Sequence, residues 1–139
     1  MENRHLCKAR PIGTRKQWVT GFYAVLGEKT VIIVNEPEKF YDVDSGKNSH
    51  GNKIVEVIPN TICQCTAMPD KNNKLIFEND IVIKHNDDDK EPYLIRWSEN
   101  YAAWELAQCG CAMYGFFDVD FGEIEVIGNA IDNPELLEV

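Results

Sequence analysis

Short apolar runs alternate with polar, turn-forming stretches along the chain, and this pattern predicts β-strands rather than helices. Residues 17–34 hold two aromatic and β-branched runs on either side of Gly27-Glu28, which is typical of a β-hairpin. Further strand patterns follow at residues 53–59, 76–84, 93–97, 102–107 and 124–131. Roughly seven or eight short strands with regular turn signals predict a mainly β fold, either a barrel or a sandwich.

The segment of residues 102–107 fits two kinds of structure. Its alanines favour a helix on propensity alone. It lies, however, between the turn at residues 98–100 and Gly110, which favours a strand paired with residues 93–97. We adopt the strand interpretation.

The polar stretch of residues 35–53 separates the hairpin from the later strands. It is rich in loop-forming residues, with a short apolar patch at Phe40 and Tyr41. A change of pattern near Pro59 predicts two parts, an N-terminal hairpin and loop region of residues 1–59 and a second β region of residues 60–139.

The C-terminal end carries the signals of a helix start. Asn133 fits the N-cap, Pro134 fits the first helical position, and Glu135 interacts favourably with the helix dipole. Because so few residues follow, we expect no more than a short helical turn.

The stretch TAMPDKNNKLIFENDIV, residues 66–82, joins a polar half to an apolar half. Asn73 and Asn79 are residues that tolerate positive φ, so they predict a tight turn and a second bend. Asp80 can accept backbone N–H groups within that bend and hold it. We interpret the stretch as a structural corner rather than as a site.

The same stretch is similar to the signature of the YopX family of phage and prophage proteins, typically TGLKDKNGKEIYEGDIV. Asn73 and Asn79 stand where that family usually has glycine, and Ala67 stands near another family glycine. The ending EVIGNAIDNPELL, residues 125–137, resembles the family's EVIGNIYENPELL. Trp18-Val19 with Gly21 resembles its N-terminal W-V-x-G strand.

This resemblance implies an SH3-like β-barrel in residues 60–139, with the N-terminal hairpin or meander packed on it. It implies no known activity. It also implies a phage or prophage origin. From the residues themselves we expect no cofactor and no catalytic residues.

The net charge and the hydropathy of the chain indicate which partners and which cellular location to expect. The chain of 139 residues has a formal net charge of −9, which argues against a nucleic acid partner because a phosphate backbone repels such a surface. A positive bias at the N-terminal end comes from Arg4, Lys8, Arg10, Arg15 and Lys16, which we interpret as solvated. The sequence has no apolar run long enough to span a membrane and no hydrophobic signal core, so we expect a cytoplasmic protein.

Five cysteines include two C-x-C pairs, Cys63 with Cys65 and Cys109 with Cys111. On a strand, residues i and i+2 share a face, so the two pairs together offer four thiolates of the kind that bind zinc. Structural zinc sites use longer spacings, however, and we expect reduced, metal-free thiols.

Other reactive groups form no recognisable site. The carboxylates of residues 87–89 beside His85 fit no calcium-loop template and are interpreted as a solvated loop tip. His5 and His50 lie in a terminus and a loop, without a nucleophile in a shared motif. The aromatic side chains between residues 97 and 117 are interpreted first as core and interface packing, and second as a peptide-binding groove: Trp97, Tyr101, Trp104, Tyr114, Phe116 and Phe117.

We therefore expect a non-enzymatic YopX-like protein that acts by protein binding. The apolar hairpin of residues 17–34 cannot bury both of its faces alone, which predicts a homo-oligomer with these residues in its interface. Two other classes stay open: an acidic inhibitor of a basic host or phage protein, and a metal-dependent enzyme that uses the C-x-C pairs.

Overall fold

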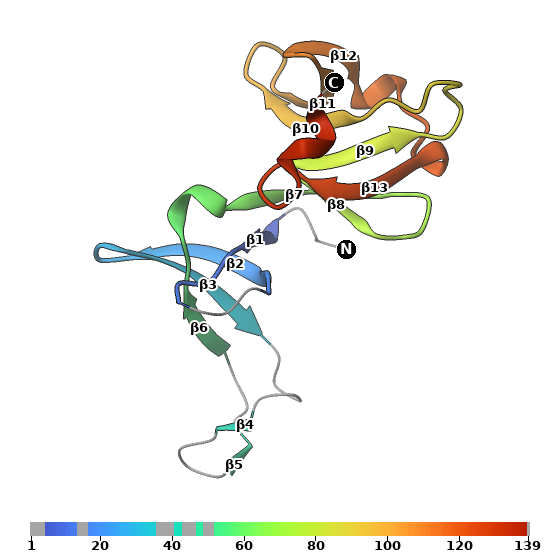
Figure 1. The fold of residues 1–139 in the computed structure, drawn as a ribbon. Helices are drawn as coiled ribbons and strands as arrows, with labels where there is room; N and C mark the ends of the chain where they lie inside the picture. The colour runs from blue at the N-terminus through green and yellow to red at the C-terminus, as the bar shows by residue number, and fades with distance from the viewer. Residues whose placement is uncertain (1–4, 14–16, 36–40, 43–46, 49–51, 139) are drawn as a thin grey trace. The chain divides into compact units, whose positions relative to one another are not determined.

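The computed structural model describes residues 5–13, 17–35, 41–42, 47–48 and 52–138. The chain divides into two compact units, an N-terminal unit of residues 5–63 and a C-terminal unit of residues 64–138. Figure 1 shows that both are built from short strands. The sequence pattern predicts the division a few residues earlier, after Pro59.

The N-terminal unit is an antiparallel sheet in the order β6-β3-β2-β1. Its elements are β1 (Cys7–Ala9), β2 (Val19–Leu26), β3 (Lys29–Asn35), the short pair β4 (Tyr41–Asp42) and β5 (Lys47–Asn48), β6 (Asn52–Glu56) and the 3-10 helix η2 (Pro59–Thr61). The β2–β3 hairpin turns at Gly27-Glu28 as the sequence predicts, and Gly27 has a φ of 65°.

The core of this unit is small. Ala9, Ile32 and Val57 are fully buried, and partly buried apolar side chains such as Val19 and Val55 pack around them. Strand β2 approaches β3 so closely that a Cβ at Gly21 would collide with the backbone carbonyl of β3. Ile32 lies opposite Val55 in the register of β3 and β6, so this core lies on the face of the sheet opposite Ile33 and Ile54.

The C-terminal unit contains an antiparallel five-stranded sheet in the order β12-β11-β10-β9-β13, and strand β7 pairs with β8. Its strands are β7 (Cys63–Pro69), which begins at the division between the units, β8 (Leu75–Phe77), β9 (Asp80–Lys84), β10 (Tyr93–Ser98), β11 (Ala103–Gln108), β12 (Cys111–Gly115) and β13 (Ile124–Asn129). The 3-10 helices are η3 (Phe116–Asp118), η4 (Phe121–Glu123) and η5 (Pro134–Leu137).

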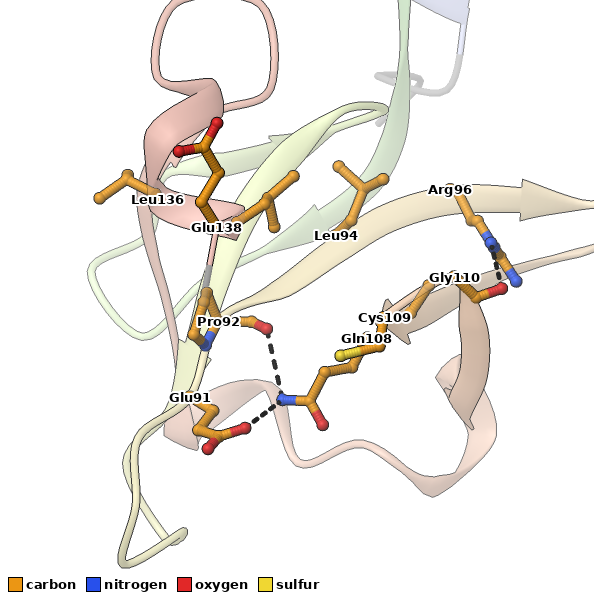
Figure 2. Close-up of a pocket in the computed structure, with 11 residues that line it drawn as sticks. Glu91, Pro92, Leu94, Arg96, Gln108, Cys109, Gly110, Leu136 and Glu138 are labelled. Carbon is orange, nitrogen blue, oxygen red and sulfur yellow. Dashed lines mark hydrogen bonds between the residues drawn. The ribbon is translucent and has the colours of Figure 1, made fainter.

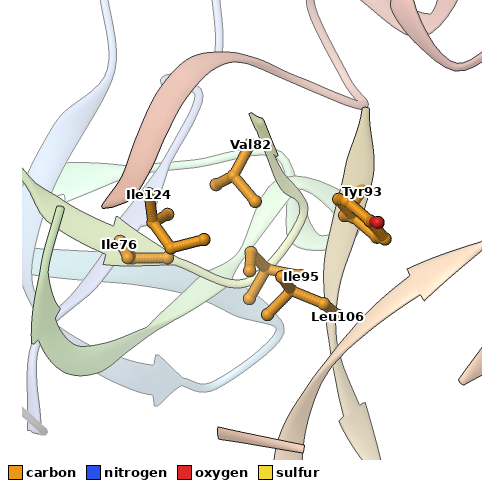
Figure 3. Close-up of a cluster of buried hydrophobic side chains, with 6 residues drawn as sticks. All are labelled: Ile76, Val82, Tyr93, Ile95, Leu106 and Ile124. Carbon is orange, nitrogen blue, oxygen red and sulfur yellow. The ribbon is translucent and has the colours of Figure 1, made fainter. Parts of the chain in front are cut away.

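Six buried side chains form the core of the C-terminal unit (Figure 3): Ile76, Val82, Tyr93, Ile95, Leu106 and Ile124. They come from five strands, β8 to β11 and β13, so each strand contributes to one shared apolar cluster. Partly buried aromatic rings such as Trp104, Tyr114 and Phe116 pack against this cluster and extend it towards η3.

The turn of residues 70–74 is fastened to strand β13 by the buried carboxylate of Asp70. Its Oδ1 accepts two backbone N–H groups of the turn itself at 2.9 Å, and its Oδ2 accepts the N–H of Val126 at 3.0 Å. The backbone N–H of Lys71 also donates to the carbonyl of Ile124 at 2.7 Å. The turn thereby covers the outer edge of β13.

The bends of the same segment have left-handed backbone conformations. Asn73 has a φ of 64° and Asn79 a φ of 71°, which confirms the prediction from sequence, and Ala67 adds a third such position at 70°. Asp80 Oδ2 accepts the backbone N–H of Phe77 at 2.8 Å, so this side chain holds the second bend as expected. The segment is the corner of the fold.

The structure confirms a mainly β chain and the pairing of residues 102–107 with residues 93–97, seen as β11 with β10. It also contains the C-terminal helical turn, η5; Asn133 stands at its N-cap, but its Oδ1 accepts the N–H of Asn129 instead of a helix N–H. Closure into an SH3-like barrel is not seen: the described sheet ends at β12 on one side and at β13 on the other. Strands β1, β7 and β12 were not predicted, because they are short or lack a clear alternation.

The left-handed conformation of Asn73 can be tested by substitution. Asn73→Val should lower the free energy of unfolding by about 1–2 kcal/mol, because a β-branched side chain is strained at positive φ. Asn73→Gly should leave it unchanged or raise it slightly. Urea denaturation measures both. The matched control is Asn72→Val, since Asn72 is also exposed but has no positive φ. Equal losses in the two valine variants would contradict the explanation.

Candidate functional site

A row of apolar side chains crosses one face of the N-terminal sheet. The strand register places Phe22 opposite Ile33, and Ile33 opposite Ile54, so the three lie side by side on the same face. Phe22 is 47% exposed and Ile54 is 56% exposed. We call Phe22, Ile33 and Ile54 the apolar row.

Three more exposed apolar side chains follow along β2 towards its turn: Tyr23, Val25 and Leu26. They lie, like Phe22 and Ile33, within the segment of residues 17–34 that the sequence predicts as an interface. Ile54 was missed. The alternation of residues 53–57 gives a strand, but only the register of β6 beside β3 shows that Ile54 joins Phe22 on one face.

The basic residues of the N-terminal unit are more ordered than the sequence suggests. The ammonium group of Lys8 lies 4.9 Å from the centre of the Trp18 ring, and the guanidinium group of Arg10 lies 5.1 Å from it. Both distances fit cation–π contacts. The sequence predicts that these basic side chains are simply solvated. This prediction is corrected for Lys8 and Arg10, because both contact Trp18. Arg4, Arg15 and Lys16 lie outside the described residues.

In the C-terminal unit a groove of about 590 Å³ opens where β11, β12 and η3 meet. Aromatic and apolar side chains line much of it, and Glu105 and Asp118 are its carboxylates. We call this the aromatic groove, and its principal apolar residues are Tyr101, Trp104, Met113, Tyr114, Phe116 and Phe117.

The aromatic residues that the sequence singled out divide into two groups. Trp97 packs edge-to-face on Trp104 at 5.2 Å, and Phe116 makes a similar pair with Phe121 at 5.0 Å. Tyr101 is 82% exposed and Phe117 is fully exposed. The interpretation as internal packing holds for Trp104 and Phe116, which pack against the core, whereas Trp97 is 44% exposed beside Trp104. The second group leaves large rings in solvent.

A smaller pocket of about 300 Å³ lies between strands β10 and β11 and the C-terminal turn η5 (Figure 2). Leu94 and Leu136 give it an apolar lining. Gln108 Nε2 donates to Glu91 Oε2 at 3.1 Å, and Arg96 Nη1 donates to the carbonyl of Gly110 at 3.2 Å (Figure 2). Arg96, Gln108 and Glu91 are thus engaged in hydrogen bonds at its rim, and Cys109 and Glu138 complete its polar lining.

The two C-x-C pairs occupy different environments. Cys63 and Cys65 are buried in β7; the thiol of Cys63 donates to the carbonyl of Thr61 at 3.4 Å. Cys109 and Cys111 are exposed at the β11–β12 turn. In the described part of the chain, no three Cys, His, Asp or Glu side chains gather as a metal site. That the thiols are reduced and bind no metal stays a prediction.

The carboxylate loop after β9 is partly tied to the sheet. Asp87 accepts a hydrogen bond from the hydroxyl of Tyr93 at 3.0 Å and forms an ion pair with Lys84 at 3.5 Å. Burial of the phenol, assisted by this hydrogen bond, raises the pKa of Tyr93 well above its usual value. The loop is therefore not entirely the solvated tip that the sequence suggests, although Asp88 and Asp89 are exposed.

The histidines do not form a catalytic arrangement with the cysteines in the described structure. His85 Nε2 lies 2.7 Å from Glu125 Oε1, a pairing between distant segments that the sequence did not indicate. His5 is exposed, and His50 lies outside the described residues. No described helix is long and apolar enough to cross a membrane.

Comparison with known proteins gives one finding about the family. A family model described as YopX protein matches residues 25–138. In the N-terminal sheet the match covers β3, β6 and the last two residues of β2, and it leaves out β1 and Phe22. It covers the whole described C-terminal unit, including the aromatic groove. A search of curated proteins finds no match.

The different burial of the cysteines predicts their reactivity. In the native protein, N-ethylmaleimide should modify Cys109 and Cys111 about tenfold or more faster than Cys63 and Cys65, because burial blocks reaction until the structure opens. Peptide mapping by mass spectrometry gives the rates, and urea-unfolded protein is the control in which the difference should vanish. Similar rates in the native protein would contradict the described burial.

The absence of a bound metal is a separate prediction. Protein purified without chelator should contain no stoichiometric zinc by elemental analysis. A stoichiometric zinc signal that is lost on Cys63→Ser would overturn this expectation and support the metal-dependent alternative.

Proposed function

The chain belongs to the YopX family, and from this premise we propose that it acts without catalysis, by protein binding, as a homo-oligomer that pairs through the apolar row. A phage or prophage origin and a cytoplasmic location are part of the same proposal. They rest on the resemblance of the sequence to the YopX proteins of phages and prophages.

The exposure of Phe22 and Ile54 is the observation that carries the proposal. Both side chains are about half exposed on an otherwise ordered sheet, and Ile33 between them makes the surface continuous. Soluble monomers seldom leave such side chains grouped in water. Fully burying an isoleucine or phenylalanine contributes roughly 1.5–3 kcal/mol, so covering these two would favour association appreciably.

A symmetric pair suits this surface. In a two-fold dimer the same patch is used by both chains, so each copy of the row would cover the other. Leu26 lies four residues after Phe22 on β2, on the same face of the sheet, and its 49% exposure extends the apolar row towards the turn. Tyr23 and Val25 lie on the opposite face. The competing arrangement is that the loop of residues 35–53 covers the row within one chain through Phe40 and Tyr41; Phe40 lies outside the described residues, and only the backbone of Tyr41 is described.

Mass measurement of a lysine variant tests the proposal. Size-exclusion chromatography with light scattering should give the wild-type chain a multiple of the single-chain mass. Ile54→Lys should reduce it to the mass of one chain, because a buried ammonium group has no partner in the interface. Circular dichroism should show that the variant stays folded, since Ile54 is exposed.

The matched control is Ile127→Lys, which adds the same charge at an exposed isoleucine of the C-terminal unit and should leave the mass unchanged. Ile32 is unsuitable for this test, because it is fully buried in the core of its unit and a lysine there would unfold it. A wild-type chain with the mass of one copy would refute the proposal.

A further inference from the structure

We propose that the aromatic groove of the C-terminal unit binds a basic, extended peptide segment of another protein. Tyr101 and Phe117 present their rings to solvent at the groove, 82% and 100% exposed. Arginine and lysine side chains bind favourably over such rings, and the gain is larger when the pair is shielded from water. The site is separate from the apolar row, which lies in the other unit.

The distribution of charge selects a basic ligand. Every Lys, Arg and His of the chain lies at or before Arg96, and the segment from Trp97 to Val139 contains only acidic charged residues. The groove is built within that segment, from residues 98–118, with Glu105 and Asp118 in its lining. A cationic segment is attracted to this surface, whereas a nucleic acid phosphate is repelled.

Two cations of earlier strands lie near the groove, and both are already paired. Arg96 Nη2 lies 3.3 Å from Glu105 Oε2. Lys84 Nζ lies 3.8 Å from the centre of the Tyr114 ring and 3.5 Å from Asp87 Oδ1. The lysine shows that an aromatic ring of this groove accepts a cation inside the protein itself. Asp118 keeps its carboxylate exposed at the groove.

The neighbouring strand favours an extended ligand. Strand β12 contributes four groove residues, 112–115, and is the last strand of the described five-stranded sheet, paired with β11 on one side. Its other side has no strand partner among the described residues. An edge of this kind binds a peptide by adding a strand, while side chains of the peptide enter the adjacent groove.

Fluorescence anisotropy of a labelled peptide tests the inference on the full chain. The probe is a short fluorescein-labelled peptide in which arginine and threonine alternate, and the control probe carries glutamate in place of arginine. The arginine peptide should bind and the glutamate peptide should not. The double variant Tyr101→Ser with Phe117→Ser should weaken binding by about tenfold or more. Both side chains are exposed, so the variant should fold normally.

The matched control variant removes two negative charges outside the aromatic groove. Asp88→Asn with Asp89→Asn takes two exposed carboxylates from the loop after β9 without touching the groove, and should change binding by less than about threefold. A loss as large as that of the aromatic variant would mean non-specific attraction to an acidic protein and would overturn the inference.

Other occupants give different outcomes. Absence of binding by the wild-type chain, or equal binding of the two peptides, would refute a basic ligand. If the aromatic variant binds as wild type does, the groove is not the site. If the wild type binds no peptide and the aromatic variant alone loses self-association, the groove belongs to a contact between copies of the chain, and the inference is wrong.

Discussion

The buried carboxylate of Asp70 joins two parts of the chain that are far apart in sequence. It accepts two N–H groups of its own turn and the N–H of Val126, which lies 56 positions later. Hydrogen bonds to a charged acceptor contribute about 1.5–3 kcal/mol each, and a buried acceptor left without donors costs a comparable amount. Because the turn must sit at the outer edge of β13 for these bonds to form, Asp70 fixes where the corner of residues 66–82 docks. Asp80 then fixes the bend from which β9, a central strand of the sheet, begins.

The two edge strands of the five-stranded sheet, β13 and β12, have different surroundings as a result. The edge at β13 is covered by the Asp70 turn, whereas β12 has no strand beyond it in the described structure. A small unit also has little interior for large side chains. The exposed rings of Tyr101 and Phe117 accordingly gather beside β12, and the half-exposed apolar row remains on the sheet of the other unit. Both surfaces are suited to binding other chains, which is the basis of the function proposed for this YopX-family protein.

Much of the corner could be predicted from sequence, because its signals are local. Asn73 and Asn79 stand at positions of positive φ, and asparagine is the residue other than glycine that best tolerates them. Alanine itself gives no such signal, since it rarely adopts this conformation, and only the resemblance to the family, which has a glycine near Ala67, pointed to it. The bond from Val126 to Asp70 could not be predicted either, because it depends on how distant segments meet. The same holds for Ile54, because its neighbours on the apolar row are set by the strand register. The two cysteine pairs have the same spacing in the sequence, yet one pair is buried and the other is exposed, and the spacing alone could not distinguish them.

Hydrogen–deuterium exchange of the Val126 amide, followed by NMR, tests the role of Asp70 most directly. Val126 lies on an edge strand with its N–H directed to Asp70, so without this acceptor the amide would exchange readily with water. The structure predicts a protected amide in the wild-type chain and exchange at least about tenfold faster in Asp70→Ala, measured relative to amides of β11 as an internal reference for overall stability. A Val126 amide that exchanges like an unstructured peptide in the wild type, or equally slowly in both proteins, would contradict this account.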